Sequence, residues 1–306
     1  MPAGEDLRPR IGSSSATEPS ADPDGSLGAV QTMLVTGATG GIGLEASVEL
    51  ARAGARVVMV GRNAAKINAA LANVRKRSGS ETVEALCCDF ASQAAVRALA
   101  ADYLAAYDRL DVLVNNAGAV YAHRTVTEDG IEATFAVNHL GAFLLTGLLR
   151  DLILRSAPAR IVNVSSVGHY NGTLDFDDLG FEHGYQIMRA YSRSKLANVM
   201  FTRSLAAQLD GTGVTVNALH PGTVATGIWS GAPWFARPVL AVAKRLVMIS
   251  PAEGAKRIVH LATSPEVADV TGQYFEDDKP KDPAPLAKDD AAAQRLWAES
   301  ARLVKL

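Results

Sequence analysis

The chain has 306 residues, of which 48% are apolar and 20% are charged, and its formal net charge is −2. This length suits one large domain or two small ones, and the composition is ordinary for a globular protein. The charge balance and the lack of a Lys/Arg run argue against a nucleic-acid surface. The two cysteines, Cys87 and Cys88, are adjacent, so we expect no disulfide framework and predict a cytoplasmic location.

The N-terminal 28 residues are rich in Ser, Pro, Gly and acidic residues. Such a segment buries too little apolar surface to offset its ordering entropy, so we expect residues 1–28 to form a disordered tail. The segment lacks the apolar core of a secretory signal, and no apolar run reaches the roughly 18 residues of a membrane span. We therefore expect a single domain over residues 29–306 and no membrane span.

From residue 30 onward, short apolar segments rich in β-branched residues alternate with segments of helical periodicity. The continuous apolar runs are typical of strands buried on both faces of a parallel sheet. We predict a doubly wound α/β domain with about seven parallel strands and helices on both faces. The expected strands are 32–37, 55–61, 83–89, 110–116, 160–166, 214–220 and 273–276. The expected helices are 42–53, 63–77, 92–107, 128–154, 187–210, 252–263 and 289–303.

The first expected strand leads into TGATGGIG, a glycine-rich turn at the start of a helix. Gly37 permits a tight turn, and Gly41 and Gly43 let a phosphate and the sheet approach the backbone. A phosphate there would accept hydrogen bonds from the free N–H groups of the helix start. A plain strand-to-helix turn is the alternative, but the position directly after the first strand favours dinucleotide binding.

The end of the second expected strand bears on which dinucleotide binds. Proteins that bind NAD usually carry an acidic residue there for the ribose 2′-hydroxyl. This chain has Gly61, Arg62 and Asn63, and Arg62 could pair with a 2′-phosphate. We therefore predict NADP in preference to NAD, although Arg62 could instead be a solvated turn residue. Asp89, after the third strand, could accept from the adenine amine or simply begin a loop.

Small and polar residues also follow the fourth and fifth expected strands. NNAG, residues 115–118, leaves room for a flat ligand, and we expect one of its Asn side chains to bond to a neighbouring strand. Ser165 and Ser166 lie at the same carboxyl edge, where ligands bind in open α/β sheets. The chain has no G-x-S-x-G motif here, which argues against a serine hydrolase.

The sequence YSRSK places Tyr191 and Lys195 four residues apart in an expected helix, so the two side chains share one helical face. The unperturbed pKa of a phenol is about 10, and a neighbouring cation favours the phenolate. Tyr191 could then accept a proton, or donate one in the reverse direction. A surface contact is the alternative, because this spacing also occurs by chance.

Together, TGATGGIG, NNAG, the Asn138 of VNHLG, NVSS and YSRSK resemble the short-chain dehydrogenases/reductases in their order and spacing. The resemblance covers residues 30–275 and is to the compact single-domain branch, which implies a Rossmann-type sheet. Stretches such as IVNVSSVGHY and GVTVNALHPGTVAT look most like the retinol dehydrogenase and WW-domain oxidoreductase group. We expect this chain to lack the N-terminal apolar anchor of the membrane-bound members.

The resemblance implies a role for each matching residue. Tyr191 would be the acid/base, and Lys195 would lower its pKa and hold the nicotinamide ribose. Ser166, rather than Ser165, would bind the substrate oxygen. Asn138 would help to hold a water in a proton relay, although an Asn in an apolar helix could instead satisfy backbone groups. The implied cofactor-binding residues are Gly37, Thr39, Gly41, Ile42, Gly43, Arg62, Asp89, Phe90, Asn116, Ala117, Gly118, Tyr191, Lys195, Pro221, Val224 and Thr226.

These residues predict an NADP-dependent oxidoreductase that transfers a hydride between nicotinamide and an apolar carbonyl or alcohol substrate. Residues 168–189 and 227–250 should shape the substrate pocket. The second segment follows an amphipathic helical pattern, so it could form a lid, or it could pack on the core or a partner chain. No ligand spacing links the histidines near the site, so we expect no metal. These histidines are His139, His169 and His183.

Two other functions share parts of this pattern. A nucleotide-sugar epimerase would share the cofactor site and the Tyr–Lys pair, but it should have a longer C-terminal half and an acidic residue after the second strand. A non-catalytic dinucleotide sensor or scaffold would need the glycine turn, but not Ser, Tyr and Lys together.

Two surface features follow from the same pattern. The helices at 92–107, 128–154 and especially 187–210 could pair across a twofold axis in a homo-oligomer. The polar stretch DDKPKDPAPLAKDD is expected to be a surface loop before the last helix.

Overall fold

The computed structural model describes residues 30–222 and 249–306. By its contacts the chain divides into two units, Met1–Val30 and Gln31–Leu306, and all described helices and strands belong to the second. The expected N-terminal tail lies outside the described residues, as does nearly all of the expected amphipathic segment at 227–250.

One eight-stranded sheet forms the centre of the domain, in the order β3-β2-β1-β4-β5-β6-β7-β8. The strands from β3 to β7 in this order are parallel, and β8 pairs with β7 in the antiparallel direction. The order reverses between β1 and β4, the place where doubly wound folds bind ligands. The strands are β1 (Thr32–Thr36), β2 (Arg56–Gly61), β3 (Val83–Cys87), β4 (Val112–Asn115), β5 (Ala159–Val164), β6 (Val214–His220), β7 (Tyr274–Glu276) and β8 (Lys279–Lys281).

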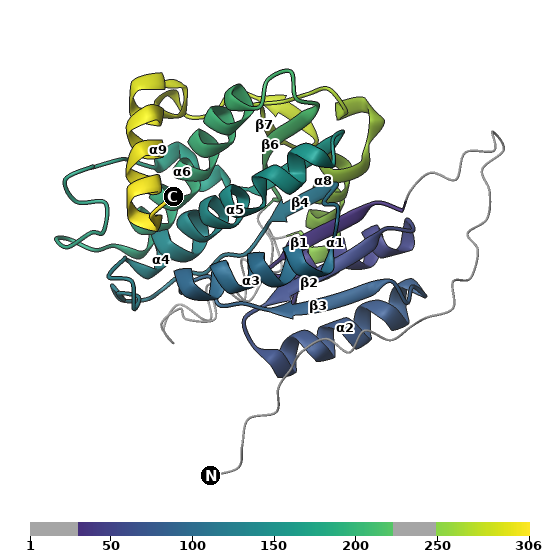
Figure 1. Ribbon diagram of the computed structural model, residues 1–306. Helices are drawn as coiled ribbons and strands as arrows, with labels where there is room; N and C mark the ends of the chain where they lie inside the picture. Colours follow the sequence, from purple (N-terminus) through teal and green to yellow (C-terminus); the bar gives the residue numbers. More distant parts are fainter. Residues whose placement is uncertain (1–29, 223–248) are drawn as a thin grey trace, which may run out of the picture. The chain divides into compact units, whose positions relative to one another are not determined.

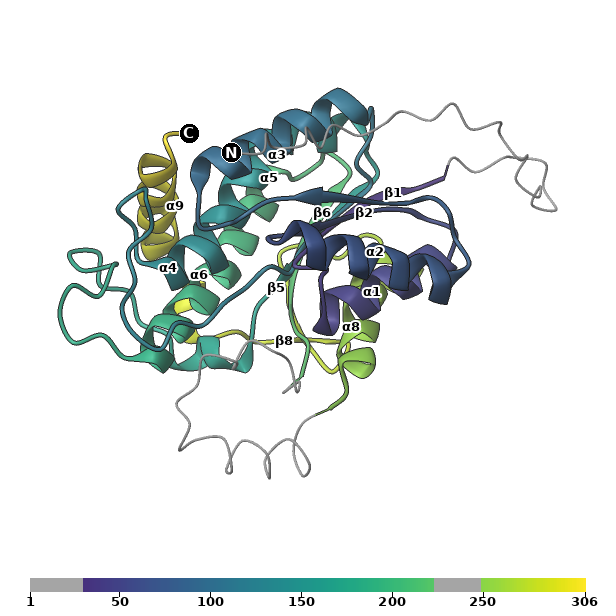
Figure 2. The same cartoon turned by 90° about the horizontal axis from the view of Figure 1, so that it is seen from below.

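Helices cover both faces of this sheet, as Figures 1 and 2 show. One face carries α1 (Gly41–Arg52), α2 (Ala64–Ser78) and α8 (Pro251–Thr263). The other face carries α3 (Gln93–Ala106), α5 (Gly141–Arg155) and α6 (Ile187–Gln208), with α9 (Asp290–Val304) packed outside them.

Alternate residues of each parallel strand fill two separate apolar cores. On β1, Met33 and Val35 pack with α1, α2 and α8, whereas Leu34 packs with the helices of the opposite face. Because side chains alternate across a strand, one continuous apolar run supplies both cores. This is why the strand sequences lack polar alternation, and the predicted doubly wound parallel sheet is confirmed.

The helix expected to begin at residue 128 begins at Ala133 instead. The buried carboxylate of Glu132 accepts hydrogen bonds from the backbone N–H groups of Thr134 and Phe135, and these bonds fix the start of the helix. The helix then continues through a π-helical turn, with the bounds α4 (Ala133–Phe135), η1 (Ala136–Leu140) and α5 (Gly141–Arg155).

This continuous helix, Ala133–Arg155, is long and apolar enough to cross a membrane by length and composition. In the structure, 67% of its most apolar window is buried, and the helix packs against α3 and α6. Burial in the core of the domain therefore accounts for the apolar composition of this helix.

The polar stretch expected to be a surface loop contains the edge strand β8 and a short 3-10 helix, η6 (Pro285–Lys288). The side chains of β8 are exposed, whereas Ala284 and Ala287 are buried. The prediction of a simple loop was wrong, because an edge strand pairs through its backbone and can keep charged side chains in water.

The last helix, α9, covers part of α5 and α6. The ring of Trp297 packs against those of Phe143 and Phe201, with centroids 4.9 and 5.8 Å apart. The sequence predicted that α5 and α6 could pair across a twofold axis, and α9 takes up part of that surface (Figure 1).

Candidate active site

Segments far apart in the sequence meet at the carboxyl edge of the parallel strands. They are the turn after β1, the residues that follow β4, β5 and β6, and the N-terminal half of α6. Open α/β sheets bind ligands at this edge, beside the reversal of the strand order.

The turn after β1 leaves the start of α1 open. Gly37 and Gly41 have φ angles of 68° and 58°, in the left-handed region that favours glycine. Gly40 precedes the helix, and among the described residues no side chain caps the first turn. The first N–H groups of α1 are therefore placed to receive an anion such as a phosphate.

Asn116 holds this turn in shape. Its side-chain amide donates to the carbonyl oxygens of Thr36 at 2.8 Å and Gly37 at 3.2 Å, while the Thr36 hydroxyl accepts from the Asn116 backbone N–H. A Cβ added to Gly43 would lie 2.5 Å from Asn116 Nδ2, so only glycine fits there. Asn116 was predicted to bind cofactor, and its contacts are those of the structural alternative, a bond to a neighbouring strand.

Two further predicted cofactor residues, Arg62 and Asp89, follow the strands β2 and β3. Arg62 is exposed directly after β2, and its guanidinium hydrogen-bonds the Tyr121 hydroxyl. Burial raises the pKa of Tyr121, and the positive charge of Arg62 opposes that shift. Asp89 is half-buried, and its Oδ1 accepts from the backbone N–H of Ala91, as expected of a residue that begins a loop.

Three other predicted cofactor residues lie at the same edge of the sheet, after β1 and β3. Thr39 turns its methyl group toward Gly61, where an added Cβ would lie 2.3 Å from Thr39 Cγ2. Ile42 is buried at the start of α1, and Phe90 is buried against Gly141. The contacts of these side chains are packing contacts.

Gly118 lies directly beside two of the predicted catalytic residues. A Cβ added to Gly118 would lie 3.5 Å from Asn138 Oδ1 and 3.8 Å from Lys195 Nζ. The preceding Ala117 is fixed by a hydrogen bond from its backbone N–H to the Thr36 hydroxyl. A glycine here leaves the surface above the ammonium group open to a ligand.

The residues after β6 complete this edge only in part. Pro221 is buried directly after the strand, and Gly222 has a φ of 92°. A Cβ on Gly222 would lie 2.3 Å from Ile249 Cδ1, which favours glycine there. Val224 and Thr226, also predicted to bind cofactor, lie outside the described residues.

The three predicted catalytic groups of β5 and α6 lie together. The Tyr191 side chain is hydrogen-bonded to that of Ser166. Lys195 is 3% exposed, and its Nζ donates to the Val164 carbonyl at 2.9 Å and lies 5.7 Å from the centroid of the Tyr191 ring. A hydroxyl, a phenol and an ammonium group thus share one small region at the end of β5.

Burial controls the proton affinities of this group. It raises the pKa of Tyr191, and the hydrogen bond to Ser166 opposes the shift only in part. Burial also lowers the pKa of Lys195 to about 8. The sequence predicted that Lys195 would lower the pKa of Tyr191, but in the protein alone the removal of the phenol from water is the larger effect.

The two neighbouring serines have different contacts. Ser165 is buried, and its hydroxyl donates to the Lys195 carbonyl at 2.8 Å. Ser166 is half-buried, and its Oγ accepts from the backbone N–H of Gly168 at 3.1 Å. Ser166 therefore faces Tyr191, while Ser165 fastens α6 to the sheet.

Asn138 lies in the π-helical turn η1, a feature often found at functional sites. Its Oδ1 accepts from the Ala119 N–H at 2.7 Å, and its Nδ2 donates to the Ala119 carbonyl and to Ser194 Oγ. The side chain thus satisfies backbone groups, which was the alternative to a proton-relay role. Its backbone carbonyl accepts from the Asn198 side chain at 2.9 Å.

A buried polar chain that the sequence did not reveal supports this turn. The Asn198 Nδ2 faces the carbonyl oxygens of Asn138 and Val164, so its Oδ1 must face His139 Nδ1 at 3.2 Å. His139 Nδ1 therefore carries the proton, and Nε2 accepts from Ser300 Oγ at 2.9 Å. Burial lowers the pKa of His139 to about 4, so it stays neutral at physiological pH.

His169, the second histidine singled out above, connects Ser166 to the C-terminal segment. Its Nε2 accepts from the Ala284 N–H at 3.1 Å, so Nδ1 must donate to the Ser166 carbonyl at 2.7 Å.

The third histidine, the exposed His183, lies 3.9 Å from an Asp178 oxygen. Within residues 30–222 and 249–306, no three His, Cys, Asp or Glu side chains cluster as metal ligands.

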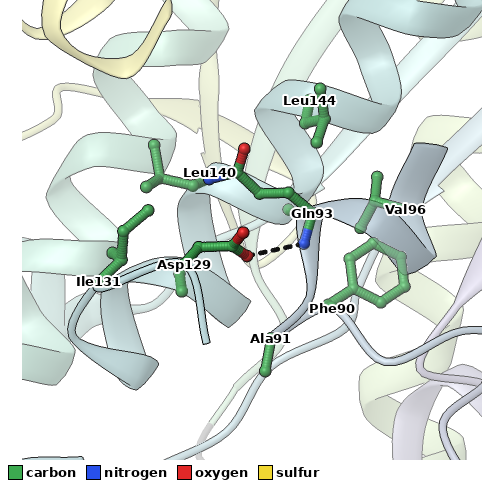
Figure 3. A pocket seen from close by; sticks show the side chains of 10 residues that line it. Phe90, Ala91, Gln93, Val96, Asp129, Ile131, Leu140 and Leu144 are labelled. Carbon is green, nitrogen blue, oxygen red and sulfur yellow. Dashed lines mark hydrogen bonds between the residues drawn. The ribbon is translucent and has the colours of Figure 1, made fainter. Parts of the chain in front are cut away.

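A small apolar cavity lies apart from these groups, between α3 and the helix that begins at Ala133 (Figure 3). Its cavity volume is only about 10 Å³, and the polar groups at its rim bond to each other, Gln93 N–H to Asp129 Oδ2 at 2.9 Å. It offers no unpaired chemistry for catalysis. Its lining residues are Phe90, Ala91, Gln93, Val96, Asp129, Ile131, Ala136, Leu140, Gly141 and Leu144.

Known proteins are similar to this chain in sequence and in fold. The model of the short chain dehydrogenase family matches residues 31–233. Human retinol dehydrogenase 13 is 45% identical over 281 residues, which cover 90% of this chain and 85% of the human protein. Mouse retinol dehydrogenase 14 is 44% identical, over 87% of this chain and 84% of the mouse protein.

The chain belongs to the short chain dehydrogenase family. It groups with the retinol dehydrogenases, so the predicted family is confirmed, and it is an NAD(P)-dependent oxidoreductase that acts on CH–OH groups.

Solved structures of the family have the same fold. An actinorhodin polyketide ketoreductase variant with NADPH has a TM-score of 0.66 and 29% identity, over 84% of this chain and 97% of its own. The RhlG/NADP complex of Pseudomonas aeruginosa has a TM-score of 0.65 and 28% identity, over 83% and 96% of the two chains.

The buried chain through Asn198 leads to a first prediction. Replacing Asn198 with Leu would leave the Asn138 carbonyl and the His139 N–H without this partner in the core. We expect Asn198→Leu to lower the free energy of unfolding by about 2–4 kcal/mol in urea titrations. Gln208→Leu, at an exposed position of the same helix, is the control. Equal stabilities of the two variants would contradict the importance of the chain.

Proposed function

We propose that this protein is an NADP-dependent oxidoreductase that reduces apolar carbonyl compounds and oxidises the corresponding alcohols, with Tyr191 as the acid/base. The observation that carries the proposal is the cluster of Ser166, Tyr191 and the buried Lys195 beside the open surface at Gly118. A nicotinamide cofactor, when bound, would supply or accept the hydride.

The residues present fit such a cofactor. The uncapped start of α1 offers N–H groups to a pyrophosphate, and Gly43 packs too closely on Asn116 to carry a side chain. Lys195 and Gly118 lie together at the same edge of the sheet, where the nicotinamide ribose hydroxyls could accept from the ammonium.

Each side chain then has one task in carbonyl reduction. The Ser166 hydroxyl would hold the substrate oxygen beside Tyr191. The raised pKa of Tyr191 keeps the phenol protonated at neutral pH, so it can give its proton to the oxygen as the alcohol forms. In alcohol oxidation Tyr191 must first lose that proton, and the charge of Lys195 would favour the phenolate. At neutral pH the protonation state of Tyr191 therefore favours carbonyl reduction over alcohol oxidation.

NADP is the proposed cofactor. No acidic residue follows β2, and the exposed Arg62 offers a guanidinium to a 2′-phosphate. The ketoreductase and RhlG structures, which were solved with NADPH and NADP, support the same choice.

An apolar substrate is proposed on two grounds. Val167 follows Ser166 directly and Met188 lies about one helical turn before Tyr191, and both are exposed, at 37% and 49%, so each is available to contact an apolar substrate. The similar proteins are named retinol dehydrogenases.

We also propose a cytoplasmic location, which the free thiols of Cys87 and Cys88 support.

Removing the phenol tests the acid/base role. Tyr191→Phe should lower kcat for carbonyl reduction by about 100- to 10,000-fold, because the proton donor is lost. Binding of NADPH, followed by fluorescence, should change little. Tyr107→Phe, at the far end of α3, should retain full activity. If Tyr191→Phe kept wild-type kcat, Tyr191 would not be the acid/base.

The pH dependence tests Lys195. The group is charged below its pKa of about 8 and neutral above it. If its charge holds the cofactor ribose, kcat/KM for NADPH should be constant below pH 8 and fall as the pH rises through about 8. The raised pKa of Tyr191 places the loss of its proton at higher pH. A profile that rises between pH 7 and 9 would contradict this role.

The choice of cofactor depends on Arg62. Arg62→Ala should weaken NADPH binding about 10- to 100-fold by removing charge-assisted hydrogen bonds, and should leave NADH binding nearly unchanged. Arg56→Ala, at the other end of β2, controls for the loss of a positive charge. Equal weakening of both cofactors, or of neither, would rule out Arg62 as the 2′-phosphate ligand.

A further inference from the structure

Arg193, between Tyr191 and Lys195 on α6, makes contacts that the proposed chemistry does not use. It is 2% exposed, and its guanidinium donates only to backbone carbonyls among its described hydrogen bonds. The acceptors are Thr173 at 3.0 Å, Asp178 at 2.5 Å and Leu179 at 3.0 Å. All three lie in the segment 172–186, which connects the end of the β5 region to the catalytic helix.

The same guanidinium stacks on Phe181. Its Cζ lies 3.6 Å from the ring centroid, a close cation–π contact, and the ring is 3% exposed. Phe181 has a φ of 48°, a left-handed conformation that a bulky residue rarely adopts. Such a conformation persists only where surrounding contacts impose it, and Arg193 supplies them from the catalytic helix.

The absence of a carboxylate among these hydrogen bonds is informative. The nearby Asp178 uses its side chain to accept from the backbone N–H groups of Glu182 and His183. Burial lowers the pKa of Arg193, but an arginine stays charged in proteins. A buried charge held by several carbonyls of one segment fixes the shape of that segment more than it stabilises the fold.

Segment 172–186 is also joined to the residues that follow β4. Arg124 Nε donates to the Gly180 carbonyl at 2.8 Å, and the Tyr185 hydroxyl donates to the Tyr121 carbonyl at 2.8 Å. Both segments follow strands whose carboxyl ends form the candidate active site. We call segments 119–124 and 172–186 together the joined loops.

We propose that Arg193 is a positioning residue that sets substrate specificity, because it fixes the joined loops to the same helix that carries Tyr191. The inference rests on the proposed function. Arg193 lies two residues from Tyr191 on one rigid helix, so the clamp would hold the joined loops in register with the proton donor. A substrate long enough to reach the joined loops would depend on this register, and a short one would not.

The test compares Arg193→Met and Arg193→Lys with Arg189→Met. Arg189 is the matched control, since it lies on the same helix, is exposed, and faces the same Phe181 ring at 5.7 Å. The measurements are kcat and KM with NADPH for aldehydes of increasing chain length, the Kd for NADPH, and hydrogen exchange of residues 172–186.

For Arg193→Met we expect faster exchange in residues 172–186 and a KM for long apolar aldehydes raised roughly tenfold or more. The KM for short aldehydes and the Kd for NADPH should stay within a few-fold of wild type. Arg193→Lys keeps the charge but loses the planar fork, so it should fall between Met and wild type. Arg189→Met should resemble wild type.

Two results would overturn the proposal. Exchange of residues 172–186 at the wild-type rate in Arg193→Met would show that Arg193 does not fix them. Faster exchange with an equal change of KM at every chain length would show a purely structural role. If the wild-type protein reduced no aldehyde, the proposed function itself would fail, and the exchange data would still decide whether the clamp exists.

Discussion

The contact between the Lys195 ammonium and the Val164 carbonyl is the interaction on which the site depends. It joins α6 to the last residue of β5, and both residues are buried. Ser165 strengthens the same junction by donating to the Lys195 carbonyl. With helix and strand fixed together, Ser166 at the strand end and Tyr191 one helical turn before the lysine must meet. The chemistry is thus a consequence of how one helix packs on one strand.

Burial makes that junction rigid and also sets its proton affinities. Removal from water raises the pKa of Tyr191 and lowers that of Lys195 to about 8, so the two pKa values move apart and the phenol holds its proton to higher pH than the ammonium does. In the protein alone the raised pKa keeps the phenol protonated at neutral pH. A bound cofactor with a cationic ring and ribose hydroxyls would add charge and hydrogen bonds to the same space, which would favour the phenolate that alcohol oxidation requires.

Much of this arrangement could be predicted from the sequence, because continuous apolar strands and a glycine-rich turn have few structural solutions. The sequence left alternatives open where a polar side chain could turn in more than one direction. Asn116 turns back to the glycine turn, and Asn138 turns to the residues that follow Gly118. Nothing in the sequence indicated the roles of Asn198 and Arg193, because their partners are backbone carbonyls of other segments. Spacing along a helix shows which side chains share a face, but only the packed structure shows what that face meets.

The most direct test of hydride transfer uses NADPH in which both hydrogens at C4 of the nicotinamide are deuterium, with an apolar aldehyde as the acceptor. The site geometry predicts that one deuterium appears on the carbinol carbon for each NADPH consumed, and that the hydroxyl proton comes from solvent through Tyr191. Tight binding of NADPH by the folded protein, with no deuterium in any alcohol across a broad aldehyde panel, would contradict the account.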